Sequence, residues 1–146
     1  MQFTHEVNWT ASDFAVFALM LAMAGGGFEL ALRLSRHAAY RAAAALALGA
    51  AFLMFWANGA VGLIGSEDNS VNRAFDALLL VPLLGSLLVR GRAAGMARVM
   101  LVTALAQLGL ATWAWWAAYG HVWVLTAFFM AIWLSAAGLF REAAAA

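Results

Sequence analysis

The segment 56–69 organises the chain and reads Trp56-Ala57-Asn58-Gly59-Ala60-Val61-Gly62-Leu63-Ile64-Gly65-Ser66-Glu67-Asp68-Asn69. It begins inside a long apolar run and ends in the most polar loop of the sequence. Its apolar part carries one amide, Asn58, and three glycines spaced by three. Polar side chains are unfavourable inside an apolar environment, so this junction is the first place to look for a functional site.

The composition predicts a membrane protein. Of the 146 residues, 66% are hydrophobic and 10% are charged, whereas soluble domains have about 45–50% and about 25%. The net charge of +1 gives no global field that would attract nucleic acid. The absence of cysteine excludes disulfides, thiolate sites and iron–sulfur clusters. With one proline and no polar linker, residues 1–146 are expected to form a single helical domain.

Five apolar runs are candidates for transmembrane helices, since a span needs about 20 residues. The runs are 14–32, 42–64, 74–89, 99–118 and 122–140. Ser12 is the expected cap of the first, and Pro82 is expected to kink the third, which is short. A single helix over 99–140 would be about 63 Å long, twice the membrane core. The sequence therefore favours an all-α bundle of five spans, with a turn at 119–121 inside an aromatic belt. Four spans are less favoured, because neither final run has a charged face that would suit the membrane surface.

The arginines predict the orientation. Five spans place seven of the eight arginines on one side and leave only Arg73 on the other. Cytoplasmic loops are enriched in basic residues. The N-terminus is therefore expected outside and the C-terminus in the cytoplasm.

The segment 56–72 resembles a group of small, uncharacterised integral membrane proteins of bacteria with the pattern W-A-N-x-A-V-G-x-I-G-S-E-x-N and a further asparagine. The matching residues here are Trp56, Ala57, Asn58, Ala60, Val61, Gly62, Ile64, Gly65, Ser66, Glu67, Asn69 and Asn72. The resemblance implies the inner membrane of a bacterium as the location and implies no activity. Ser70 stands where the group's pattern suggests proline.

Three polar residues are expected at membrane depth, and each has a structural and a functional interpretation. Glu29 lies four residues before Arg33, which favours an exposed ion pair; the alternative is a proton-accepting carboxylate. Asn58 and Gln107 are expected to hydrogen-bond a neighbouring helix. The alternative is that Glu29, Asn58 and Gln107 line a transport path.

Small residues predict sites of close helix packing. One set is Gly59, Gly62 and Gly65 near the end of the second run, and the other is Ala127, Ala131 and Ser135 on the last run. The helix that packs against the second set is expected either in the same chain or in another subunit. For the glycines, the alternative is an unwound helix end that lines a cavity. The aromatic residues Phe128, Phe129 and Trp133 are expected to face lipid or a partner.

The outer side is expected to be acidic and solvated, with Glu67, Asp68, Asn69 and Asp76 in or next to one loop. An ion pair is expected between Asp76 and Arg73. His5 and His121 are weak candidates for a metal site, because no paired-histidine spacing accompanies them. His37 is on the opposite side and cannot pair with either of them as an axial ligand of a haem. No metal and no cofactor are therefore expected.

These observations favour a non-enzymatic membrane protein, an accessory or structural subunit that packs against itself or a larger complex. The alternative is a small transporter or channel. No catalytic serine–histidine–carboxylate set lies at one depth, and no phosphate-binding loop or nucleic-acid face is present.

Overall fold

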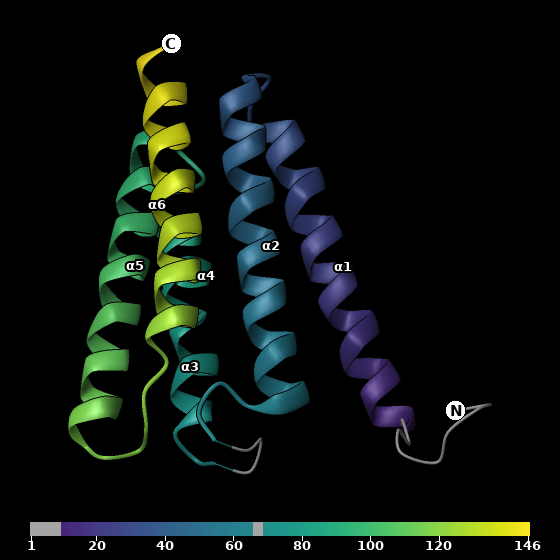
Figure 1. The fold of residues 1–146 in the computed structure, drawn as a ribbon. Coiled ribbons are helices and arrows are strands. Elements are labelled where there is room, and N and C mark those ends of the chain that lie inside the picture. The colour runs from purple at the N-terminus through teal and green to yellow at the C-terminus, as the bar shows by residue number, and fades with distance from the viewer. Residues whose placement is uncertain (1–9, 66–68) are drawn as a thin grey trace.

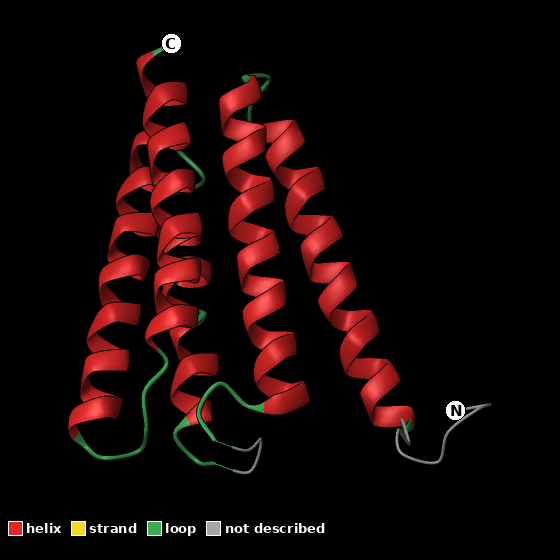
Figure 2. Ribbon diagram, in the orientation of Figure 1, coloured by secondary structure: helices red, strands yellow, loops and turns green. Residues whose placement is uncertain are grey.

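The computed structural model describes residues 10–65 and 69–146, and within these ranges it contains helices and loops but no strand (Figure 2). The helices are α1 (Ala11–Leu34), α2 (Ala38–Val61), α3 (Asn72–Leu78), α4 (Leu80–Leu88), α5 (Ala93–Trp116) and α6 (Trp123–Ala145). They lie roughly side by side, and the described loops gather at the two ends of the bundle (Figure 1). The start of α1 is at the lower end in that view, and the end of α6 is at the upper end.

Among the described residues, four helices are long and apolar enough to cross a membrane: α1, α2, α5 and α6. The third apolar run forms two short helices, α3 followed by α4, with an interruption at Leu79. The interruption has a local cause, because Pro82 has no N–H to donate to the carbonyl of Leu78 and its ring crowds that carbonyl. α3 and α4 have 7 and 9 residues. With Leu79 they rise about 25 Å, slightly less than a membrane core of about 30 Å.

Several helix boundaries differ from those expected. α1 is capped by Thr10 rather than Ser12, because Thr10 and Asp13 form a reciprocal capping box. α2 ends at Val61, three residues early, since Gly62 takes a positive φ of 72°. α5 begins at Ala93, six residues before the expected start at 99.

Many positions in the interior are alanines, which pack beside a few large side chains such as Phe75, Trp133 and Phe140, while most large apolar side chains of the long helices are exposed. Ala43, Ala114 and Ala136 are fully buried, on α2, α5 and α6 respectively. In contrast, the exposed residues include leucines and valines on every long helix and tryptophans on α2, α5 and α6. This distribution suits a lipid environment, where close helix contact needs small side chains and apolar surface can remain exposed.

Two of the three aromatic residues expected to face outward on the last helix are buried. Phe128 is 52% exposed as expected, but Phe129 is 3% exposed and Trp133 is 0% exposed. The expectation was wrong for Phe129 and Trp133, because small residues on the facing helices leave room for large rings. Trp133 also has a polar partner inside the bundle, which is described below.

α1 is a peripheral helix. Within α1, which is described in full, Ala31 is the one buried residue. The helix approaches α2 closely at Gly27, where an added Cβ would lie 2.9 Å from a methyl group of Leu48. Toward its N-terminal end α1 leans away from α2 (Figure 1), and the ring of Phe17 bridges the gap to Phe52 and Trp56.

Candidate functional site

A buried amide network forms where α2 ends and α3 begins. The side chain of Asn58 is 3% exposed. Its Nδ2 donates to the carbonyl of Asn72 and to Oδ1 of Asp76, both at 2.8 Å. Its Oδ1 accepts from the N–H of Leu63 at 3.2 Å. One amide therefore joins the last turn of α2, the turn that follows it and two positions of α3 that are one helical turn apart.

The loop geometry that makes this network feasible depends on glycines. Gly62 and Gly65 have φ values of 72° and 70°, a region that side chains with a Cβ rarely adopt. The turn they form brings Ile64 back to α3, where its N–H donates to Oδ1 of Asn72 at 2.9 Å. The side chain of Asn72 in turn donates to the carbonyl of Ile64 at 3.3 Å. Asn72 thus satisfies both backbone groups of a buried loop residue.

The network is a structural clamp. Every polar atom of the Asn58 side chain has a partner in the chain, which is the arrangement that makes a buried amide favourable. Asp76 accepts from Asn58 and forms no ion pair with Arg73, so the expected local pair is wrong. Helix geometry accounts for this, because α3 turns the carboxylate of Asp76 toward α2.

Gln107 and Trp133 form a second buried polar contact. Gln107 is 2% exposed, and its Oε1 accepts from Nε1 of Trp133 at 2.8 Å. The bond joins α5 to α6 near the middle of both helices. Thr103, also buried on α5, donates to the carbonyl of Val99 on its own helix. Gln107 therefore holds two helices together, as the structural interpretation of the sequence expected.

Glu29 lies on the outside. Its Oε1 accepts from Nε of Arg33 at 2.9 Å, and both side chains are more than half exposed. The structure does not bring Glu29, Asn58 and Gln107 together: Glu29 is near the upper end of peripheral α1, Asn58 is near the lower end of α2, and Gln107 is inside the α5–α6 contact (Figure 1).

The outer acidic loop is only partly described. Glu67, Asp68, His5 and Glu6 lie outside the described residues. Asn69 accepts from the N–H of Val71 through its side chain and so shapes the turn into α3. His121 is exposed in the loop between α5 and α6. In the part of the chain that the structure describes, no three histidine, aspartate or glutamate side chains gather to hold a metal.

The small residues expected at packing sites are exposed on the helix surface or form part of the turn after α2. Gly59 is exposed and an added Cβ would meet nothing within 4 Å, whereas Gly62 and Gly65 shape the turn just described. Ala127, Ala131 and Ser135 all face outward on α6. Their packing against another subunit stays a prediction.

Three residues contribute contacts that sequence reasoning missed. Trp133 binds Gln107, and Asn72 completes the clamp. At the opposite end of the bundle, the hydroxyl of Tyr40 donates to the carbonyl of Gly91 at 2.6 Å. The asparagine at 72 was visible as part of the resemblance, but neither tryptophan nor tyrosine carried a spacing signal.

Comparisons with models of known protein families, with curated proteins and with solved structures returned no match to this chain. The chemistry of its own residues is therefore the basis for assigning a function.

Proposed function

We propose that this chain is a non-enzymatic, multi-pass membrane protein that acts as an accessory or structural subunit, packing against copies of itself or against a larger membrane complex. One observation carries the proposal. The buried amides Asn58 and Gln107 have partners inside the bundle, while large apolar side chains cover its outside. Such a molecule presents its surface, rather than an interior cavity, for interaction.

A transport function has less support. A path would need polar groups that converge, and Glu29, Asn58 and Gln107 are on different parts of the bundle. Two hollows on the surface, of about 190 and 470 Å³, are lined by none of these three residues. We therefore do not retain transport as a second candidate.

The accessory role is tested by extraction in mild detergent from the native membrane, followed by mass measurement of the intact particle. A particle containing further copies or foreign chains is expected. The variant Ala131→Leu, on the outward stripe of α6, is expected to weaken that association. The matched control is Leu105→Phe, which enlarges a 66% exposed side chain on α5. A monomer free of other chains would contradict the proposal.

The proposed topology has five crossings, with the N-terminus outside, the C-terminus in the cytoplasm and the bacterial inner membrane as the location. It is supported by the arginine distribution and by the path of α3 and α4, which together lead from the lower to the upper end in Figure 1. The resemblance in the segment 56–72 supports the bacterial location.

Because the chain has no cysteine, single cysteines can map this topology directly. Arg36→Cys and Ala146→Cys are expected to resist a membrane-impermeant maleimide in intact cells, and His121→Cys is expected to react. If α3 and α4 entered and left on the same side, Arg36→Cys and Ala146→Cys would differ in reactivity. That result would overturn the five crossings and leave the accessory role to its own test.

A further inference from the structure

Two hollows on the surface of the bundle meet at one arginine. The first, of about 190 Å³, lies between α4 and α5 and is apolar apart from Arg98 at its edge. The second, of about 470 Å³, lies between the start of α5 and the end of α6. Arg98 lines both, and Arg141 of α6 lines the second. No other side chain is shared by the two linings.

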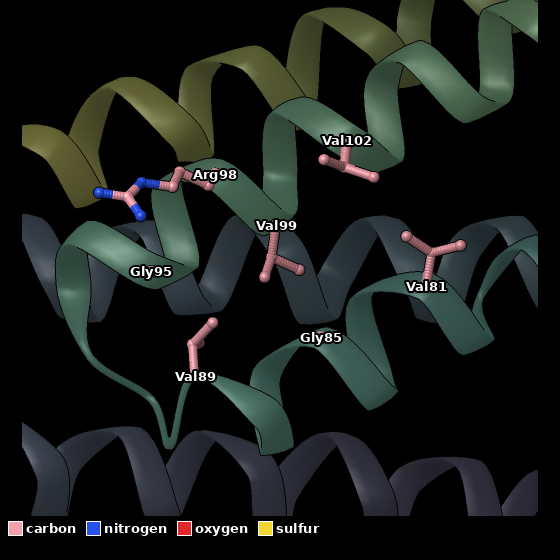
Figure 3. Close-up of a pocket in the computed structure, with 7 residues that line it drawn as sticks. All are labelled: Val81, Gly85, Val89, Gly95, Arg98, Val99 and Val102. Carbon is pink, nitrogen blue, oxygen red and sulfur yellow. The ribbon is translucent and has the colours of Figure 1, made fainter.

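The α4–α5 hollow is a groove with a valine lining. Figure 3 shows Val99 pointing from α5 toward Gly85 of α4, while Arg98 extends away from the valines toward α6. α4 and α5 lie close together at this groove, with glycine at both points of contact. An added Cβ at Gly85 would lie 2.7 Å from a methyl group of Val99, and one at Gly95 would lie 2.5 Å from Cβ of Val89. The outer edge is Val102, which is 54% exposed.

The α5–α6 hollow is open because its walls are mostly alanine. Ala94, Ala97, Ala144 and Ala145 line it beside Leu101 and the two arginines. Neither Arg98 nor Arg141 forms an ion pair with any carboxylate in the described chain, although Glu142 follows Arg141. Two uncompensated guanidinium groups at one hollow favour an anion.

The two arginines lie near the ends of their helices, at the same end of the bundle (Figure 1). Arg98 is five residues after the start of α5, and Arg141 is four residues before the end of α6. Each is therefore about 6–8 Å along the axis from the end of its own helix. In the proposed topology this end of the bundle is at the cytoplasmic face of the membrane, next to the lipid headgroups. Basic pockets between transmembrane helices bind lipid phosphate groups through such arginines.

We propose that Arg98 and Arg141 bind the phosphate of one anionic phospholipid, with an acyl chain of that lipid in the valine-lined groove between α4 and α5. The lipid is the occupant that fits both halves of the site, because it joins an anionic group to a hydrocarbon chain. The proposal depends on the membrane location of the chain and is independent of the accessory role.

The test is native mass spectrometry of the detergent-purified full chain, titrated with phosphatidylglycerol or with phosphatidylcholine of the same acyl chains. The wild type is expected to retain one phosphatidylglycerol at least about tenfold more tightly than phosphatidylcholine, as two arginines near the headgroup allow. The double variant Arg98→Gln/Arg141→Gln is expected to lose that preference. Arg98→Lys/Arg141→Lys is expected to keep part of it.

The matched control is Arg36→Gln/Arg92→Gln, which removes two exposed arginines from the same end of the bundle. It is expected to keep the preference for phosphatidylglycerol. An equal loss in the control would show attraction by general surface charge and overturn the site. A wild type without preference would overturn it as well.

The groove and the source of the phosphate are tested separately. Val102→Trp fills the outer edge of the groove without changing the arginines, and it is expected to lower phosphatidylglycerol retention. Unchanged retention would overturn the position of the acyl chain.

Millimolar inorganic phosphate is expected to leave bound phosphatidylglycerol in place. Displacement of the lipid by inorganic phosphate would show a site for free phosphate instead.

Discussion

α1 and α5 are both helices of 24 residues, but the rest of the chain covers little of α1 and much more of α5. In the most apolar window of each helix, 6% of the residues of α1 are buried inside the molecule, compared with 39% in α5. α1 is nevertheless the more apolar of the two. α5 buries Thr103 and Gln107 and exposes Leu105, the reverse of a soluble helix.

The difference shows which forces act on a chain in lipid. Burying a leucine against another helix gains little when lipid tails are equally apolar. Packing of small side chains and hydrogen bonds between helices therefore determine which helices form the interior. α2, α5 and α6 have these features, whereas α1 has one close approach at Gly27 and an aromatic contact at Phe17. Polar and small residues are thus expected to dominate the stability of this molecule.

The largest effect is expected for Asn58→Leu, which removes the centre of the clamp. It leaves the N–H of Leu63 and the acceptors on Asn72 and Asp76 without their partner, so the free energy of unfolding should fall by about 2–4 kcal/mol. Circular dichroism during titration with sodium dodecyl sulfate measures this change. Faster tryptic cleavage after Arg73 should accompany it, because the loop loses its attachment.

Gly59→Ala is the matched control for that clamp variant. Gly59 is the next residue on α2 and has open space around it. Alanine favours a helix by up to about 1 kcal/mol over glycine, so this variant should be as stable as the wild type or more so. Equal stability of Asn58→Leu and Gly59→Ala would show that the clamp does not stabilise the molecule.

A second pair of variants compares the inside and the outside of one helix. Ala136 and Ala131 are both on α6, but Ala136 is fully buried and Ala131 is exposed. Ala136→Leu should lower the free energy of unfolding by about 1–3 kcal/mol through overpacking. Ala131→Leu should change the stability of the monomer by less than about 0.5 kcal/mol. Equal losses in the same denaturant titration would mean that α6 packs on both faces.

The helical class and most of the long helices could be predicted from the sequence, because apolar runs of sufficient length have few alternatives. Pro82 predicted a kink in the third run, but it did not predict that the run would divide into two helices at Leu79. Whether α3 and α4 cross the membrane stays a prediction, since their combined length is close to the limit for a span.

The partners of the polar residues were less accessible to sequence reasoning. Spacing along one helix predicted the pair of Glu29 with Arg33, because four residues bring side chains to the same face. Asn58 and Asp76 are 18 residues apart, and Gln107 and Trp133 are 26 apart. Such contacts depend on which helix faces which, and one sequence contains no periodic signal for that choice.

The contact between Gln107 and Trp133 is expected to have an intermediate effect. Gln107→Leu leaves the indole N–H of Trp133 unpaired inside the bundle and should lower the free energy of unfolding by about 1–2 kcal/mol. A double-mutant cycle with Trp133→Phe isolates the hydrogen bond from the change in ring size, with an expected coupling of about 0.6–2 kcal/mol. Additive losses in the denaturant titration would show that the hydrogen bond contributes nothing.

The smallest effect is expected on peripheral α1. Glu29→Gln removes an ion pair whose side chains are more than half exposed. Exposed pairs of this kind contribute little, so the free energy of unfolding should change by less than about 0.5 kcal/mol. Arg33→Gln is the matched control and should give the same small change in circular dichroism experiments. A loss above 1.5 kcal/mol in Glu29→Gln alone, which is about three times the expected limit for such a pair, would give this carboxylate a partner beyond Arg33. It would also make α1 part of the interior that the comparison with α5 assigns to the other helices.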